Sequence, residues 1–412
     1  MPATALREFL AARRARQIDF LAALVRQPSD NPPGDCAPHA RVAAALLEEL
    51  GFAVERHLVP ADEVRAAGLV SITNLIVRHR FGPGPVIALN AHGDAVPPGA
   101  GWTRDPYGAG IADGWMYGRG AAVSKSDFAT YAFALLALRE AAPPPGGSIE
   151  LHFTYDEESG GILGPPWLLA RGLCAPDYAI SAGFSYAVVT AHNGVLHLEV
   201  EARGRSAHAA KPASGVDALA AATAILSALY RSRDALAERI SVTPGIGSPQ
   251  LTVGLIAGGI NTNVVPDRVT FRLDRRIIPE EDPGSVEAEL RALIEREVRS
   301  VAGAAVEIRR LLLAEPLRPL PSADRLASIL ARHATEIMAE PIGSAGLPLY
   351  TDARHYAARG IPTVLYGAGP RTIEDANAHR ADERVPLADL ARATEILALG
   401  LADLLNPDGF LA

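Results

Sequence analysis

The chain has 412 residues, 49% of them hydrophobic, and this length suits a large buried core in two domains or in one domain that carries an insertion. The net charge of -8 comes without a basic block, so neither nucleic acid nor an anionic membrane is an expected partner. The only two cysteines, Cys36 and Cys174, lie far apart and offer no disulfide framework, so we expect a protein of the reducing cytoplasm.

The first elements predicted along the chain alternate between helix and strand. The N-terminal stretch has charges spread through a helical pattern and is no signal peptide, and no later run reaches the roughly 20 apolar residues of a membrane helix. A second helix is predicted with Pro38 in its first turn and Gly51 just past its end, and a third from about Asp127 to Glu140. Apolar runs that predict buried, largely parallel strands lie at residues 74–80, 85–94 and 148–158.

The interval from about 195 to 313 has a different order of elements. Its patterns predict β, α, β, β, α and β, a split βαβ unit whose first helix begins near Ser214, with Ser214 and Asp217 as capping residues. From about Pro321 the helix and strand alternation resumes. We therefore expect an α/β fold with a mostly parallel central sheet flanked by helices, formed by residues 1–194 and 314–412 and interrupted by a smaller α+β domain at 195–313.

Two polar motifs follow predicted strands. In "NAHGDAVPPG" the side chains of His92 and Asp94 fall on the same face of a strand, so the carboxylate can hold an imidazole whose other nitrogen binds a metal. Taken alone, this pair favours a histidine in a simple hydrogen bond over a metal ligand. In "TYDEESGG" three acids, Asp156 to Glu158, follow another strand. Like charges this close are costly unless a cation or water faces them, and ligands of open α/β sheets bind at such strand ends.

Together with six further stretches, these motifs resemble the metal-dependent aminoacylase, glutamate carboxypeptidase and succinyl-diaminopimelate desuccinylase family of co-catalytic zinc hydrolases. The resemblance covers nearly the whole chain and implies an α/β catalytic domain with an inserted βαββαβ lid that often forms a homodimer, in agreement with the order of elements above. The matching stretches, in chain order, are "SDNPPGD", "HGDAVPPG" with "GWTRDPYGAGIADGWMYGRGA", "DEESGG", "GRSAHAAKP", "NTNVVPD", "LDRRIIP", "YTDARHYAARGIPTVLYGAG" and "AHRADERV".

The resemblance implies a role for each matching polar residue of the catalytic domain. His92, Glu158 and His379 correspond to metal ligands. Asp94 corresponds to the carboxylate behind His92, and Glu157 to the general base that takes a proton from metal-bound water.

The resemblance also implies roles for three residues of the inserted domain. His208 corresponds to the residue that reaches toward the oxyanion or carboxylate of the substrate, often across a dimer. Asn263 and Arg276 stand at positions that hold a carboxylate. Without the neighbouring motifs, Arg276 could equally form a surface ion pair and Asn263 could equally be a turn residue.

The chain departs from the family pattern at two ligand positions. The pattern Gly-Arg-Gly-Ala-x-Asp-x-Lys has an aspartate that bridges two metals, and here that position is Val123. A further acidic ligand is absent where Gly183 and Phe184 stand. Without a bridging carboxylate, two neighbouring divalent ions repel with little to offset the repulsion, although Asp127 could reach in as a replacement.

These residues predict a metallohydrolase that cleaves the C–N bond of a small substrate bearing a carboxylate, with one divalent ion, zinc or manganese before iron, and a second ion less expected. Two alternatives stay open. The apolar Val123 and Phe184 also suit the aminohydrolase branch of the family, which replaces an aromatic amine by hydroxyl, as with a nitroanthranilate. The two missing carboxylates also suit a metal-free pseudoenzyme that binds a small molecule.

Overall fold

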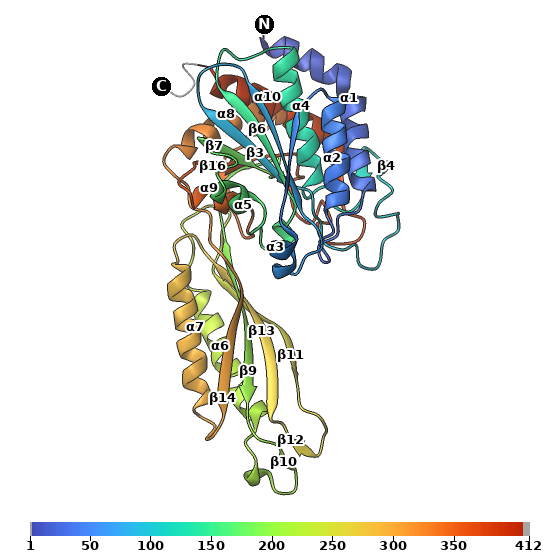
Figure 1. The fold of residues 1–412 in the computed structure, drawn as a ribbon. Coiled ribbons are helices and arrows are strands. Elements are labelled where there is room, and N and C mark those ends of the chain that lie inside the picture. Colours follow the sequence, from blue (N-terminus) through green and yellow to red (C-terminus); the bar gives the residue numbers. More distant parts are fainter. Residues whose placement is uncertain (1, 407–412) are drawn as a thin grey trace. The chain divides into compact units, whose positions relative to one another are not determined.

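The computed structural model describes residues 2–406, and residues 1 and 407–412 lie outside that description. The chain divides into two compact units (Figure 1). Unit 1 comprises residues 1–190, 319–345 and 351–412, and unit 2 comprises residues 191–318 and 346–350. The catalytic and lid roles of the corresponding predicted domains stay predictions.

Unit 1 is built on an eight-stranded sheet whose central strands, β6, β3, β7 and β16, run parallel, while β1 and β2 add an antiparallel edge. This arrangement confirms the predicted α/β class. In sheet order the strands are β1 (Val54–Leu58), β2 (Thr73–Arg80), β6 (Ser148–Thr154), β3 (Val86–His92), β7 (Tyr178–Ser181), β16 (Thr363–Leu365), β8 (Val188–His192) and β15 (Ser344–Leu347). A separate small sheet contains β17 (Arg384–Pro386), β5 (Trp115–Tyr117) and β4 (Gly110–Ala112).

Both faces of β3 are buried because helices cover both sides of the sheet. Ile87 and Leu89 belong to the main apolar core, whereas Ala88, one residue out of step, packs with Ala179 and Tyr356. The period of two residues along a strand explains this division. The helices of unit 1 are α1 (Pro2–Arg26), α2 (Ala37–Glu49), α3 (Ala61–Ala66), α4 (Lys125–Glu140), α5 (Pro165–Ala170), α8 (Ala323–Met338), α9 (Ala353–Ala357) and α10 (Leu387–Leu404).

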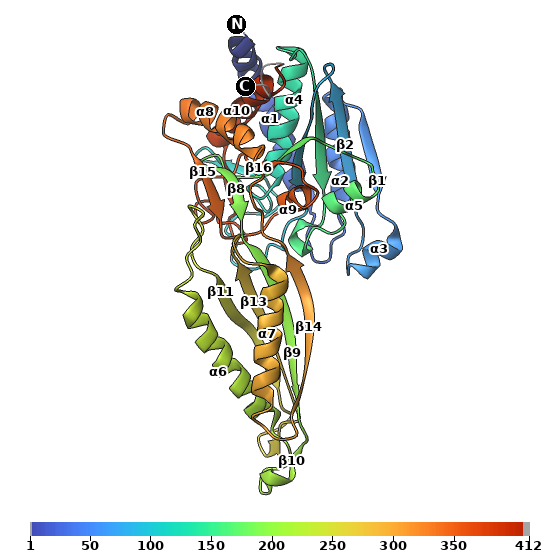
Figure 2. The same cartoon turned by 90° about the vertical axis from the view of Figure 1, so that its left-hand side faces the viewer.

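Unit 2 has an antiparallel sheet in the order β11, β13, β9, β14, and Figure 2 shows α6 and α7 on one face of it. Along β9, Leu196, Leu198 and Val200 face these helices, and Glu199 and Glu201 face the other side, where they pair with arginines. This is the predicted order of elements. Their bounds are β9 (Gly194–Arg203), β10 (Ala207–His208), α6 (Ala218–Leu236), β11 (Gln250–Gly258), β12 (Val264–Val265), β13 (Arg268–Ile277), α7 (Pro283–Val298) and β14 (Ala305–Ala314).

The predicted start of α6 was wrong by about one turn. Ser214 ends a short 3-10 turn, Pro212–Ser214, and Val216 pairs with Arg205 before the helix begins. Asp217 caps the helix alone, because its carboxylate accepts the N–H groups of the two residues after Ala218. Among residues 2–406, no helix is long and apolar enough to cross a membrane.

Candidate metal centre

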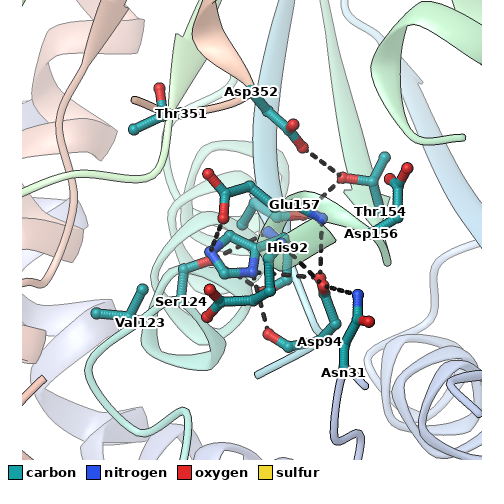
Figure 3. A network of polar contacts seen from close by, with 12 residues as sticks. Asn31, His92, Asp94, Val123, Ser124, Thr154, Asp156, Glu157, Thr351 and Asp352 are labelled. Carbon is teal, nitrogen blue, oxygen red and sulfur yellow. Dashed lines mark hydrogen bonds and ion pairs between the residues drawn. The ribbon is translucent and has the colours of Figure 1, made fainter. Parts of the chain in front are cut away.

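The two polar motifs of unit 1 meet at one edge of the large sheet. His92 is the last residue of β3, and it pairs with Thr154, the last residue of the parallel neighbour β6. A short loop then leads to a 3-10 helix, Glu157–Ser159. Because the carboxyl ends of parallel strands share an edge, the histidine and the acidic loop lie side by side, as Figure 3 shows.

Asp94 is fully buried and connects the two motifs. Its Oδ1 accepts the backbone N–H of Glu157 (3.3 Å) and lies 3.3 Å from Nδ1 of His92. Its Oδ2 accepts the N–H of Glu158 (3.1 Å) and Nδ2–H of Asn31 (2.9 Å). Nδ1 of His92 also lies 3.0 Å from the backbone carbonyl of Asp94, so Asp94 orients the imidazole through its carbonyl and its carboxylate. The same carboxylate fixes the backbone of the acidic loop, and Nε2 of His92 faces Glu157 at 3.9 Å.

Candidate ligand atoms converge at this edge. His92, Glu157 and Glu158 each offer one atom, and these atoms lie within 4.8 Å of one another, the one such group found in the described part of the chain. Nε2 of His379 lies 3.3 Å from Oε1 of Glu158, so the late histidine reaches the same carboxylate. Imidazole nitrogens with carboxylate oxygens form a donor set that suits zinc, manganese or iron.

The electrostatics of this cluster favour a bound cation. Burial, together with the charges of Glu158 and Asp94, raises the pKa of Glu157 to about 8, although the charge of His92 lowers it. Burial by itself lowers the pKa of His92, but its hydrogen bond to Asp94 and the charges of the two glutamates raise that pKa well above its usual value. Glu157 and His92 therefore hold protons more tightly than usual, and a divalent ion could replace those protons.

Val123 brings no ligand to the cluster. Its side chain packs against the main apolar core, and its backbone N–H donates to Oε1 of Glu383 (3.3 Å). The position that the family pattern assigns to a bridging aspartate is therefore apolar in this chain.

Asp127, the replacement considered for that aspartate, has other partners. Its Oδ1 accepts the N–H of Ala368 (2.7 Å), and the N–H of Gly183 also donates to its carboxylate. Burial raises its pKa to about 7. The carboxylate thus holds the start of α4 against the chain that follows β7 and β16, and it is not part of the group of candidate ligands in the described chain.

At Gly183, one of the two positions considered for the second missing ligand, the neighbouring backbone leaves no space for a side chain. A Cβ added at Gly183 would lie 2.8 Å from the backbone nitrogen of Tyr366, and Phe184 pairs with Gly369 in an isolated bridge. Backbone from another strand thus approaches the position closely.

Two buried polar residues of the site had no predicted role. Oδ2 of Asp352 accepts Oγ1–H of Thr154 (3.3 Å), and burial, followed by the charge of Glu157, raises the pKa of Asp352 to about 8. Asn31 donates to Asp94 and to Oγ of Ser159 (3.1 Å). The only sequence signal for Asn31 and Asp352 was their place within stretches that carry the family resemblance.

Within unit 2, the structure brings together only two of the three predicted substrate-binding residues. His208 ends β10, and the backbone of the next residue, Ala209, donates to the carbonyl of Asn263 (2.9 Å), at the end of the sheet where Figure 1 shows β10 and β12. Arg276 lies near the opposite end of β13, where Nε bonds Asp274 (3.0 Å). At about 3.4 Å per residue, the length of β13 separates Arg276 from the end at which His208 and Asn263 lie by roughly 27 Å.

The fold and the histidine–carboxylate cluster define a metallohydrolase that acts on amide or peptide C–N bonds. The chain belongs to Peptidase family M20/M25/M40, whose model matches residues 88–403. This result confirms the family that the sequence stretches indicate.

Two relatives of the chain have names that refer to different acyl groups, acetyl and succinyl. The chain is 30% identical over 367 residues to an acetylornithine deacetylase of Myxococcus xanthus, covering 87% of this chain and 90% of the relative. It is 30% identical over 390 residues to a succinyl-diaminopimelate desuccinylase of Rhodospirillum centenum, covering 90% and 93%. The YXEP protein of Bacillus subtilis, a dinuclear metal binding peptidase, shares the fold with a TM-score of 0.68 at 17% identity, over 96% of this chain and 99% of that one.

Proposed function

We propose that this protein is a single-metal hydrolase that cleaves the C–N bond of a small amide bearing a carboxylate. The observation that carries the proposal is the convergence of His92, Glu158 and His379 beside Glu157, with Val123 in place of a bridging acid. Two histidines and one carboxylate can hold one zinc or manganese ion and leave positions open. A second ion nearby would meet the repulsion of the first without a shared carboxylate.

The side chains around this site supply the remaining steps. Asp94 keeps the proton of His92 on Nδ1, so that Nε2 is the ligand. Glu157 takes a proton from water as the water oxygen adds to the amide carbon, and returns it to the nitrogen as the C–N bond breaks, which yields a carboxylate and an amine. A bound divalent ion would polarise the carbonyl, make the water more acidic and favour the ionised form of Glu157.

We also propose that the enzyme acts as a homodimer in which His208, Asn263 and Arg276 bind the substrate. The separation within unit 2 supports this, because one small carboxylate cannot reach both Asn263 and Arg276 of a single copy. In a symmetric dimer, His208 and Asn263 of one copy can complete a site to which the other copy contributes Arg276.

The edge of unit 2 has the character of a pairing surface. β11 is the outer strand of the four-stranded sheet, and its apolar side chains Leu255 and Ile256 are 61% and 54% exposed. Ile260, just beyond the strand, is 79% exposed. An unpaired strand edge with exposed apolar residues is the kind of surface that a second copy covers.

Metal content tests the function directly. Protein purified without chelator is analysed by elemental mass spectrometry, beside His92→Ala and His379→Ala variants. We expect about one zinc or manganese ion per chain, lost in both variants. Two ions per chain would contradict the single-metal site. No ion, even after reconstitution with zinc or manganese, would favour the metal-free binding module.

Product analysis separates hydrolysis of an amide from the aminohydrolase alternative. The loaded enzyme is offered N-acyl amino acids and, separately, aromatic amines with an adjacent carboxylate. Release of a free amino acid supports the proposal. Release of ammonia from the aromatic amine, with the acyl substrates untouched, would replace the proposal by the aminohydrolase branch, whose substrate ring would contact Val123 and Phe184.

A further inference from the structure

A buried ion pair lies beside the candidate metal centre. Nη1 of Arg119 donates to Oε2 of Glu383 (2.5 Å), and each side chain is only 1% exposed. The two residues are 264 positions apart in the chain. Breaking such a pair by removing one partner leaves an uncompensated buried charge, so both members stay in place in the folded protein.

Glu383 holds the turn that precedes α4. Its Oε1 accepts the N–H groups of Ala122 (3.1 Å) and Val123 (3.3 Å). The next residue, Ser124, is then bonded to the backbone of His92 through both its oxygen and its hydroxyl proton, at 3.0 and 2.9 Å. The carboxylate of Glu383 therefore fixes the turn that precedes α4, while Ser124 joins that turn to the end of β3.

Arg119 holds the loop that carries His379. Its Nη2 donates to the carbonyl of Arg380 (3.1 Å), the residue after the histidine. Three residues of this loop have positive φ angles, Asn377 at 48°, His379 at 61° and Asp382 at 57°. A left-handed backbone is unfavourable for a non-glycine residue, and of these three most of all for His379, so contacts from outside the loop help to maintain its conformation.

We propose that Arg119 and Glu383 are positioning residues that hold His379 against Glu158 and thereby set the metal affinity of the site. The inference rests on the proposed function, because it takes His379 as a ligand. The side chain of Val123 has no ligand atom, and the end of the turn at residues 118–123 is held by Glu383. The pair of Arg119 and Glu383, called the clamp below, acts on His379 through the backbone and touches no substrate.

The test compares Glu383→Ala and Glu383→Gln with Glu150→Gln. Glu150 is a matched control, since it is a buried acid paired with an arginine, Arg78, in β6 and away from the strand end. Zinc dissociation constants come from chelator competition, and the cobalt-loaded proteins are compared by visible absorption. We expect Glu383→Ala to weaken zinc binding about 10- to 100-fold and to change the cobalt spectrum. Glu383→Gln keeps an oxygen that can accept the N–H groups of the turn, so we expect a smaller loss of zinc affinity. We expect Glu150→Gln to bind zinc as tightly as the parent.

A double variant decides whether the effect passes through His379. Because His379→Ala is expected to lose its ion on purification, zinc is titrated to concentrations high enough to measure its weak binding. If the effect passes through His379, adding Glu383→Ala to His379→Ala weakens that binding no further. Additive losses, or parental affinity and spectrum in Glu383→Ala, overturn the clamp. A parent protein that binds no metal overturns the proposed function instead.

A second substitution keeps the test valid if the Glu383 variants do not fold. Arg119→Lys retains the charge but loses the guanidinium group, whose two terminal nitrogens bond Glu383 and Arg380. We expect weaker zinc binding with a melting temperature of the metal-free protein near that of the parent, and unchanged zinc affinity overturns the clamp.

Discussion

Asp94 is the single residue on which the geometry of the site depends most. Its two oxygens contact the His92 ring, the side chain of Asn31 and the backbone of the acidic loop. Hydrogen bonds to an ionised carboxylate are roughly twice as strong as those between neutral groups, so the charge of Asp94 matters as well as its shape.

Asp94→Asn tests that charge. The amide keeps the size of the side chain, but its nitrogen cannot accept the loop N–H groups, so we expect zinc affinity to fall about 10- to 100-fold in chelator competition. Asp177→Asn is the control, because Asp177 accepts a backbone N–H from Val86 at the opposite end of β3. Equal zinc affinity in the two variants would remove Asp94 from its supporting role.

Glu157 could act as a base or as a ligand, since its oxygen lies within the ligand group. We assign it as the base, and expect Glu157→Gln to lower kcat by about 100- to 10,000-fold while the metal content stays at the parental value. Steady-state kinetics and elemental analysis of the same preparation measure both. Loss of the metal with the activity would make Glu157 a ligand, and full activity would exclude it from the mechanism.

At the scale of elements, the first turn of α4 is coupled to β16 through one buried acid. Asp127 reaches the backbone after each of two strands, and Gly367 leaves the space for it, because a Cβ there would lie 2.1 Å from Oδ1. A glycine at this position is therefore a packing requirement for the carboxylate.

This acid predicts a dependence of stability on pH. Burial raises the pKa of Asp127 to about 7 from an ordinary 3.8. Between these values the folded protein keeps a proton that the unfolded chain loses, so the contribution of this group to stability falls as pH rises and is lost above about 7. We expect metal-free Asp127→Asn to gain stability relative to the parent across this window, at up to about 1.4 kcal/mol per pH unit. Denaturant unfolding of both proteins from about pH 4 to pH 8 measures the difference between their free energies of unfolding. A difference that does not change with pH would contradict the prediction.

At the scale of the whole molecule, the proposed enzyme needs two copies, because its predicted substrate-binding residues lie at opposite ends of one unit. Mixing two inactive variants tests this need. Glu157→Gln and His208→Ala, unfolded and refolded together, form hybrids in which one of two sites is intact, so we expect about a quarter of the parental activity.

The control for this experiment pairs Glu157→Gln with His92→Ala. Both changes lie in unit 1, and no hybrid of these two variants contains an intact site. We therefore expect no recovery from this mixture. A monomeric parent in analytical ultracentrifugation, or no recovery from the first mixture, would contradict the shared site.

The sequence alone was sufficient for the class of fold and for the family. Apolar residues that recur every two residues in a strand, or every three to four in a helix, form a local pattern. This pattern located β3, β9 and α7, because an element that buries one face needs apolar residues at that spacing. The resemblance to the family pointed to His92, Glu157, Glu158 and His379, and the structure brings these four side chains together.

Only the tertiary structure decided which groups contact one another across the chain. The bonds of Asp94 to the acidic loop span about 60 positions, and the bonds from Arg119 to Glu383 and from Ala368 to Asp127 span more than 200. No local pattern encodes such contacts, because they depend on which strands become neighbours and where each one ends. For the same reason the sequence could assign Asn263 and Arg276 to one carboxylate, whereas the length of β13 places them at opposite ends of their sheet.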